Sequence, residues 1–133
     1  MKKFLLIALT GLSIVSCTKK VSTPGAANQN VFFQDANVAV ETMQAVATAT
    51  STVTINFSTA FENNISRIEL MSSADNSTFC TSQAVDVTAN SSAKKDYRFN
   101  DSKLKGSTMY YMLRFKDDNG NWIYSPYLTV KVD

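Results

Sequence analysis

Residues 53–58 of the chain read VTINFS, with an apolar side chain at every second position. Val53, Ile55 and Phe57 would point to one side of an extended backbone, and the polar residues between them would point to the other. A period of two predicts a β-strand with one face in a core and one face in solvent. The same pattern returns at residues 68–70, 109–116 and 128–132.

Short turn segments separate these strands. Residues 75–77, 90–92 and 105–107 are rich in Asn, Ser, Asp and Gly and predict connections. The pair Asn119-Gly120 predicts a two-residue hairpin, because both residues tolerate a positive φ. Pro126 has no backbone N–H to donate, so we expect it at an edge or a bulge of the last strand.

Residues 38–50 are rich in alanine, and their composition alone leaves helix and strand open. Their Val and Thr content and the strands that follow favour an edge strand. Six or seven strands in about a hundred residues predict one all-β domain, an antiparallel sandwich of about seven strands. We place this domain at residues 31–133.

The first residues have the three parts of an export signal, namely basic residues 2–3, an apolar stretch at 4–15 and the small Ser16. A membrane-spanning helix would need about 20 apolar residues. The stretch here is shorter and is followed by polar and basic residues. We therefore expect residues 1–16 to be a signal peptide that is removed.

Residues 14–17, with the sequence Ile-Val-Ser-Cys, resemble the lipobox of bacterial lipoproteins. In that motif a branched apolar residue, a tolerant position and a small residue precede an acylated cysteine. The resemblance implies two or three acyl chains, such as palmitate, on Cys17, and each buried methylene contributes about 0.8 kcal/mol to membrane binding. Plain secretion is the alternative, although Ile14 is large for an ordinary cleavage site.

The residues after Cys17 predict a flexible tether at 17–30, because they are polar and are interrupted by Pro24 and Gly25. About 13 residues of such chain span roughly 20 Å, enough to lift a small domain off the lipid headgroups. In some Gram-negative lipoproteins, acidic residues just after the cysteine promote display on the cell surface, and none closely follows Cys17. We therefore prefer a periplasm-facing outer-membrane location to display on the cell surface.

The chain has 13 basic and 11 acidic residues, and two of the basic ones lie in the leader, so the mature chain is expected to be neutral. A nucleic-acid partner requires a net-basic face. Acidic residues are interleaved with the one candidate cluster, so we expect no nucleic-acid partner. That cluster is Lys94, Lys95, Arg98, Lys103 and Lys105.

Acylation of Cys17 would leave Cys80 without a partner, so no internal disulfide is expected. Cys80 lies beside Phe79 on a predicted strand, which favours a buried thiol over a reactive one. The chain has no histidine, which removes His-based acid–base chemistry, Ser-His-Asp triads and His-ligated zinc. We expect no metal, no cofactor and no enzymatic activity.

Residues 53–64 and 68–79 resemble the fibronectin type III-like modules of secreted bacterial proteins. In those modules an aromatic-ended strand precedes a Thr-Ala-x-Glu-x-Asn turn, and a later strand closes in Ser-x-Asp-Gly-x-x-Phe. Phe57 stands where Trp is usual, and Asn76 where Gly is usual; Phe can fill a core, and Asn tolerates the left-handed conformation. Further matches to the same module lie at residues 106–111, 117–120 and 124–125.

The resemblance implies an antiparallel immunoglobulin-like sandwich of about seven strands, without an active site. Tyr111 is the candidate for the tyrosine-corner residue of such sandwiches, and Tyr110 is the alternative if the preceding loop is one residue tighter. Asp117 and Asp118 could be read as calcium ligands or as a glycosidase carboxylate pair. Adjacent carboxylates on a hairpin more often solvate a turn, and this is the interpretation we adopt.

The candidate binding surface is aromatic, and it exists only if the face shared by Trp122 and Tyr124 points outward. Its members are Trp122, Tyr124, Tyr127 and Tyr110. We expect a membrane-anchored envelope lipoprotein that acts as a non-catalytic protein-interaction or scaffold module. The alternative is a glycan-binding accessory lipoprotein that uses the same aromatic face. The sequence leaves open the partner, the membrane face and the oligomeric state.

Overall fold

The computed structural model describes residues 16–19, 33–48, 51–103 and 106–132. Residues 1–15 of the expected signal peptide, most of the expected tether and Lys105 lie outside these ranges. The described ranges hold strands, turns and loops, and within them no helix is long and apolar enough to cross a bilayer. The strands are β1 (Cys17–Lys19), β2 (Phe33–Gln34), β3 (Val38–Ala47), β4 (Thr52–Glu62), β5 (Ile65–Ser73), β6 (Thr78–Asp86), β7 (Lys95–Ser102), β8 (Thr108–Asp117), β9 (Trp122–Tyr124) and β10 (Leu128–Lys131).

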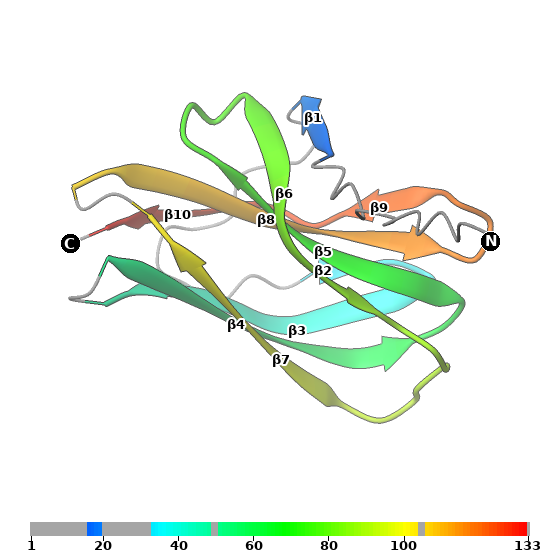
Figure 1. Ribbon diagram of the computed structural model, residues 1–133. Coiled ribbons are helices and arrows are strands. Elements are labelled where there is room, and N and C mark those ends of the chain that lie inside the picture. Colours follow the sequence, from blue (N-terminus) through cyan, green and yellow to red (C-terminus); the bar gives the residue numbers. More distant parts are fainter. Residues whose placement is uncertain (1–15, 20–32, 49–50, 104–105, 133) are drawn as a thin grey trace, which may run out of the picture.

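The strands form two antiparallel sheets that face each other (Figure 1). The larger sheet has the order β1-β6-β5-β8-β10, with β9 also paired to β8. The smaller sheet has the order β2-β3-β4-β7. The chain passes from one sheet to the other after β1, after β4, after β6 and after β7. The prediction of an all-β, antiparallel architecture is therefore confirmed.

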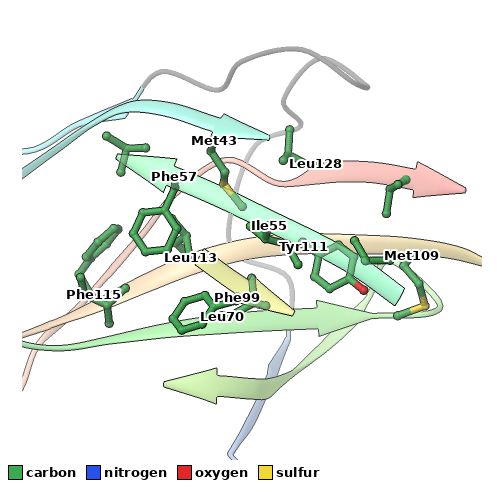
Figure 2. Packing of buried hydrophobic residues seen from close by; sticks show 14 of the residues in the cluster. Met43, Ile55, Phe57, Leu70, Phe99, Met109, Tyr111, Leu113, Phe115 and Leu128 are labelled. Atoms are coloured by element: carbon green, nitrogen blue, oxygen red, sulfur yellow. The ribbon is translucent and has the colours of Figure 1, made fainter. Parts of the chain in front are cut away.

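The hydrophobic core lies between the two sheets and is built by the predicted alternation. Ile55 and Phe57 of β4 are 0% and 2% exposed, and Tyr111, Leu113 and Phe115 of β8 are all 0% exposed. Figure 2 shows these side chains together in one cluster. Truncating a buried Leu or Phe of this kind to Ala costs about 2–5 kcal/mol, because a cavity is left behind.

The other side of β4 is less exposed than the alternation predicts. Asn56 is exposed, but Thr54 and Ser58 are buried. Thr54 donates to Asn100 Oδ1 at 3.0 Å, and the hydroxyls of Ser58 and Thr42 lie 2.7 Å apart. Side chains of the neighbouring strands β3 and β7 thus satisfy and cover these hydroxyls.

The alanine-rich segment forms β3, which confirms the prediction of a strand. It is not a free edge along its whole length, because β2 pairs Phe33 with Val40 and Gln34 with Ala39. Composition could not show this pairing, since β2 is only 2 residues long.

Pro126 lies at a bulge, as predicted. On β8, Arg114 pairs with Tyr124 of β9 and Tyr111 pairs with Leu128 of β10, so the last strand has one residue more than its partner between these pairs. At the bulge, Leu113 N donates to Ser125 Oγ at 2.8 Å, and Ser125 N donates to Leu113 O at 2.9 Å. The serine hydroxyl therefore replaces a ladder acceptor.

The hairpin between β8 and β9 forms where it is predicted, with a different turn. Residues 118–121 connect the strands, and of the pair Asn119-Gly120 only Gly120 has a positive φ, 86°. Gly120 N donates to Asp117 O at 3.1 Å, and Asp117 N donates to Asn121 O at 2.9 Å. This is the longer type of hairpin loop, in which a glycine adopts the left-handed region after the turn.

Glu62 ends β4 with a fully buried carboxylate. Thr59 donates to its Oε1 at 2.8 Å, Tyr97 donates to the same oxygen at 2.5 Å, and Lys95 Nζ lies 3.2 Å from Oε2. Two residues later Asn64 takes a left-handed φ of 54°, as Asn76 does at 57°. Asn76 thus adopts the conformation for which the sequence resemblance expects glycine.

Candidate functional site

The side chains of functional interest lie on the face of the larger sheet that points away from the core, which we call the outer face. Successive residues of a strand point to opposite sides, so Tyr110, Met112 and Arg114 of β8 lie opposite the core-facing Tyr111 and its neighbours. The register with β5, β6 and β9 adds residues of those strands to the same face. The outer face comprises Glu69, Met71, Phe79, Tyr110, Met112, Arg114, Trp122, Tyr124 and Tyr127.

The outer face brings together the four predicted aromatic residues. In the register, Trp122 pairs with Lys116 and Tyr124 pairs with Arg114, so both rings point outward. The ring of Tyr127 lies edge-on to that of Tyr110, with centroids 6.0 Å apart. Tyr127 is 8% exposed, and the other three rings are half-buried.

Beneath these rings is a second hydrophobic cluster that the sequence patterns do not predict. Met71, Phe79 and Met112 are each 0% exposed and pack with Tyr127, separately from the core between the sheets. Alternation places Met112 on the face of β8 opposite Tyr111, as the structure has it, but does not predict that this face is buried. The available signal is that residues 109–115 are apolar or aromatic at almost every position, which is typical of a strand buried on both faces.

A charge network crosses the outer face beside this cluster. Arg114 donates to Glu69 Oε2 through Nε at 2.7 Å, and its Nη2 lies 2.6 Å from the same oxygen. Arg67 Nε donates to Glu69 Oε1 at 2.9 Å, and Thr81 donates to Oε2 at 2.9 Å. Burial raises the pKa of Glu69, but the hydrogen bonds from Arg67, Arg114 and Thr81 outweigh it and the net pKa lies below its usual range.

The indole of Trp122 lies over this network. The guanidinium carbon of Arg114 is 3.9 Å from the centre of its ring, and Lys116 Nζ is 5.7 Å from that centre. A cation over an indole face is stabilised by the ring quadrupole. One face of Trp122 is therefore already in contact with the protein.

Tyr111 is the tyrosine for which we predicted a structural role. It is fully buried, and its hydroxyl donates to Asp101 Oδ2 at 2.9 Å, which also lies 3.2 Å from Lys103 Nζ. Burial and the neighbouring Asp101 both raise the pKa of Tyr111. The bond joins β8 to the end of β7, but its acceptor is a side chain, whereas a tyrosine corner bonds to the backbone. The alternative residue, Tyr110, lies on the outer face.

Asp117 organises the β8–β9 turn. Its Oδ1 accepts from Asn119 N at 2.9 Å and Asn121 N at 2.8 Å, and its Oδ2 accepts from Asn121 Nδ2 at 3.3 Å. Asp118 is exposed. Across the described ranges no group of three or more Cys, Asp or Glu side chains is placed to share a metal ion.

The candidate basic cluster is mostly paired with carboxylates. Lys95 lies 3.2 Å from Glu62, Lys103 lies 3.2 Å from Asp101, and Lys94 lies 3.9 Å from Glu41. Arg98 is exposed on β7. The lysines therefore do not form a continuous basic face.

Cys17 and Cys80 form a disulfide across a sequence separation of 63 residues. The expectation that Cys80 has no partner and that no internal disulfide forms is wrong for this structure. The physical reason is the pairing of β1 with β6, which places the two cysteines directly opposite each other. Residues 17–19, which we assigned to the tether, form this strand. The prediction that Cys17 is acylated requires the same sulfur.

Comparison with protein-family models, with curated proteins and with solved structures finds no match to this chain.

Proposed function

We propose that this protein is a lipid-anchored lipoprotein of the bacterial cell envelope, and that its β-sandwich is a non-catalytic protein-interaction module. Acyl chains on Cys17 hold it on the outer membrane, facing the periplasm. Two or more chains are needed for stable anchoring, because a single one binds only marginally. A Cys17–Cys80 disulfide supports an oxidising compartment. The anchored form lacks that disulfide, because a thioether to lipid uses the sulfur of Cys17.

Several observations support the fibronectin type III-like resemblance as part of this proposal. The chain crosses repeatedly between the two sheets, as it does in sandwiches with Greek-key connections. Within the Thr-Ala-x-Glu-x-Asn segment, Thr59 bonds the buried Glu62 and Asn64 has a positive φ. The hydrogen bond is a structural reason for Thr and Glu in this segment, and the positive φ is a structural reason for Asn.

The observation that carries the interaction role is the composition of the outer face. Half-buried Tyr110 and Tyr124 pack against a buried Met and Phe cluster, and half-buried Trp122 lies over Arg114 beside it. Tyr and Trp are among the residues that contribute most to protein–protein binding, and the buried cluster holds the rings of Tyr110 and Tyr124 in place. The carboxylate of Asp117 is used to hold its own turn, and that of Glu69 is neutralised by arginines. These contacts favour a binding role over a catalytic one.

A glycan-binding accessory lipoprotein is the second candidate, and one observation favours it. Trp122 and Tyr124 share the outer face without being fully buried, so their rings could stack on sugar rings. Arg114 and Lys116 both lie over the indole of Trp122, so a sugar would stack on the part of the ring that stays exposed. The protein-interaction role is preferred because Tyr110 and Tyr124 are held by an apolar cluster, and aromatic residues packed in this way are typical of protein interfaces.

The proposal is tested in the native membrane with a photo-crosslinking amino acid at Tyr124. The matched control carries the same amino acid at Asn56, which is exposed on the opposite sheet. A discrete protein cross-link from position 124 that is missing from position 56 is expected. Equal labelling at both positions would contradict the interaction role, and binding to a panel of polysaccharides that is lost in Trp122→Ala would favour the glycan role. Mass spectrometry of the mature amino terminus tests the anchor, since an unacylated Cys17 would refute it.

A further inference from the structure

The side of β6 that faces away from β5 accepts another strand. In this structure the occupant is the short strand β1, in an antiparallel register that pairs Cys17 with Cys80, Thr18 with Phe79 and Lys19 with Thr78. Thr81 extends the contact, because its N and Oγ1 donate to Ser16 O at 2.8 and 3.1 Å. Pairing at this edge therefore covers the first half of β6.

The composition of β6 does not protect this edge against pairing. Residues 78–85 carry no charged side chain. The edge strand of the smaller sheet, β7, instead carries Lys95, Asp96, Arg98 and Asp101. Charged residues on an edge strand oppose association with a further strand, and a neutral edge is open to it. Of these two strands, β6 is therefore the one more open to pairing with a further strand.

Processing of the chain removes the disulfide and the Ser16 hydrogen bonds that hold β1 on this edge, and it leaves only the pairing of Thr18 and Lys19 with β6. Cleavage before Cys17 takes away Ser16 and with it both hydrogen bonds to Thr81. Acylation of Cys17 uses the sulfur that is bonded to Cys80. An uncovered edge therefore depends on the proposed lipid anchor. In the anchored form, Cys80 is a half-buried thiol on an uncovered neutral edge, in an oxidising compartment.

We propose that a second copy of this chain occupies the edge, so that the anchored protein is a dimer joined through its two β6 strands by a Cys80–Cys80 disulfide. The register between β1 and β6 is the reason. Cys80 of one copy would take the position of Cys17, opposite Cys80 of the other, and Phe79 of each copy would face Thr81 of its partner. An antiparallel pair centred on one residue has two-fold symmetry, so the contact is closed and does not continue into a filament.

The covalent step is a thiol–disulfide exchange with a disulfide oxidant of the compartment. The two Cys80 thiols lose two protons and two electrons and form one S–S bond, and the oxidant's S–S bond breaks to give two thiols. Anchoring confines both copies to one membrane, which raises their effective concentration above that in free solution. Backbone hydrogen bonds between the two β6 strands stabilise the dimer in addition to the disulfide.

The test uses the full chain in its native membrane, with free thiols blocked by N-ethylmaleimide before lysis. On a non-reducing gel the acylated protein is expected to migrate as a dimer, and a reductant is expected to convert it to a monomer. Cys80→Ser should abolish the covalent dimer and leave acylation unchanged.

A shifted thiol distinguishes the two-fold register from random collision. The variant Cys80→Ser with Thr78→Cys moves the thiol two residues along the same strand, to a more exposed position. In the proposed register the two thiols introduced at position 78 lie far apart, so the covalent dimer should be lost. Cross-linking of this variant as strongly as the wild type would overturn the inference.

Two other outcomes separate the dimer from the anchor. An acylated terminus with a monomeric, alkylated Cys80 would overturn the dimer and leave the anchor standing. An unacylated chain with an intact Cys17–Cys80 disulfide would overturn both, because the edge would then stay covered.

Discussion

Arg114 and Glu69 form a buried ion pair on the outer face of the larger sheet, with Nε and Nη2 of the arginine 2.7 and 2.6 Å from one carboxylate oxygen. The two residues are 3% and 5% exposed, on the neighbouring central strands β8 and β5. A buried pair contributes little to net stability compared with apolar residues of similar size, but loss of one member leaves an uncompensated charge. The pair therefore makes the outer face sensitive to single substitutions.

Arg114→Ala is expected to lower the free energy of unfolding by about 3 kcal/mol, because the carboxylate of Glu69 stays buried with only part of its partners. Urea denaturation followed by tryptophan fluorescence and by circular dichroism measures the loss. Arg98→Ala, at an exposed position on β7, is the control and should change stability by less than about 0.5 kcal/mol. Equal losses of unfolding free energy in the two variants would show that the ion pair matters no more for stability than an exposed arginine.

The depressed pKa of Glu69 predicts acid sensitivity. The unfolded chain binds a proton near the ordinary glutamate pKa of about 4.3, and the folded protein binds it only at lower pH. The stabilisation is therefore present above about pH 4.3 and is lost as the pH falls through the folded pKa. Glu69→Gln should show a shallower decline of stability between about pH 5 and pH 2 than the wild type, measured by urea unfolding. Glu41→Gln, at an exposed position, should keep the slope of the wild type.

Tyr111→Phe is expected to lower the free energy of unfolding by about 1–2 kcal/mol, because the hydrogen bond to the carboxylate of Asp101 is lost while the ring remains in the core. Tyr110→Phe removes a hydroxyl from the outer face and should change stability by less than about 0.5 kcal/mol. Thermal and urea unfolding of both variants give the comparison. A larger loss in Tyr110→Phe would assign the structural role to Tyr110 instead.

The Cys17–Cys80 disulfide predicts a response to reductant in chains that are not acylated. Closing a loop with a sequence separation of 63 stabilises the folded state by up to about 4 kcal/mol in the chain-entropy description. Reduction should therefore lower the urea midpoint of the unacylated protein. Cys80→Ser should have the lower midpoint with or without reductant. A midpoint of the wild type that does not respond to reductant would show that the disulfide adds nothing to the stability of the sandwich.

The local patterns of the sequence determined the strands and the turns. Alternation placed Ile55, Phe57 and Tyr111 in the core, and Pro126 and Gly120 marked a bulge and a hairpin. These predictions succeed because side-chain direction along a strand and the φ preference of Pro and Gly depend on nearby residues alone. The two-residue turn at Asn119-Gly120 failed, since the choice of loop also depends on how Asp117 bonds the turn.

Only the tertiary structure decided which strands are neighbours and what covers each face. The Arg114–Glu69 pair joins residues 45 positions apart, and the Cys17–Cys80 disulfide joins residues 63 apart. Both depend on strand order and register, which local periodicity does not contain. For the same reason alternation places Met112 on the face opposite Tyr111 but does not predict that it is buried there. The sequence alone thus determined a two-sheet antiparallel fold, and the register of its strands decided which polar and sulfur-containing side chains meet.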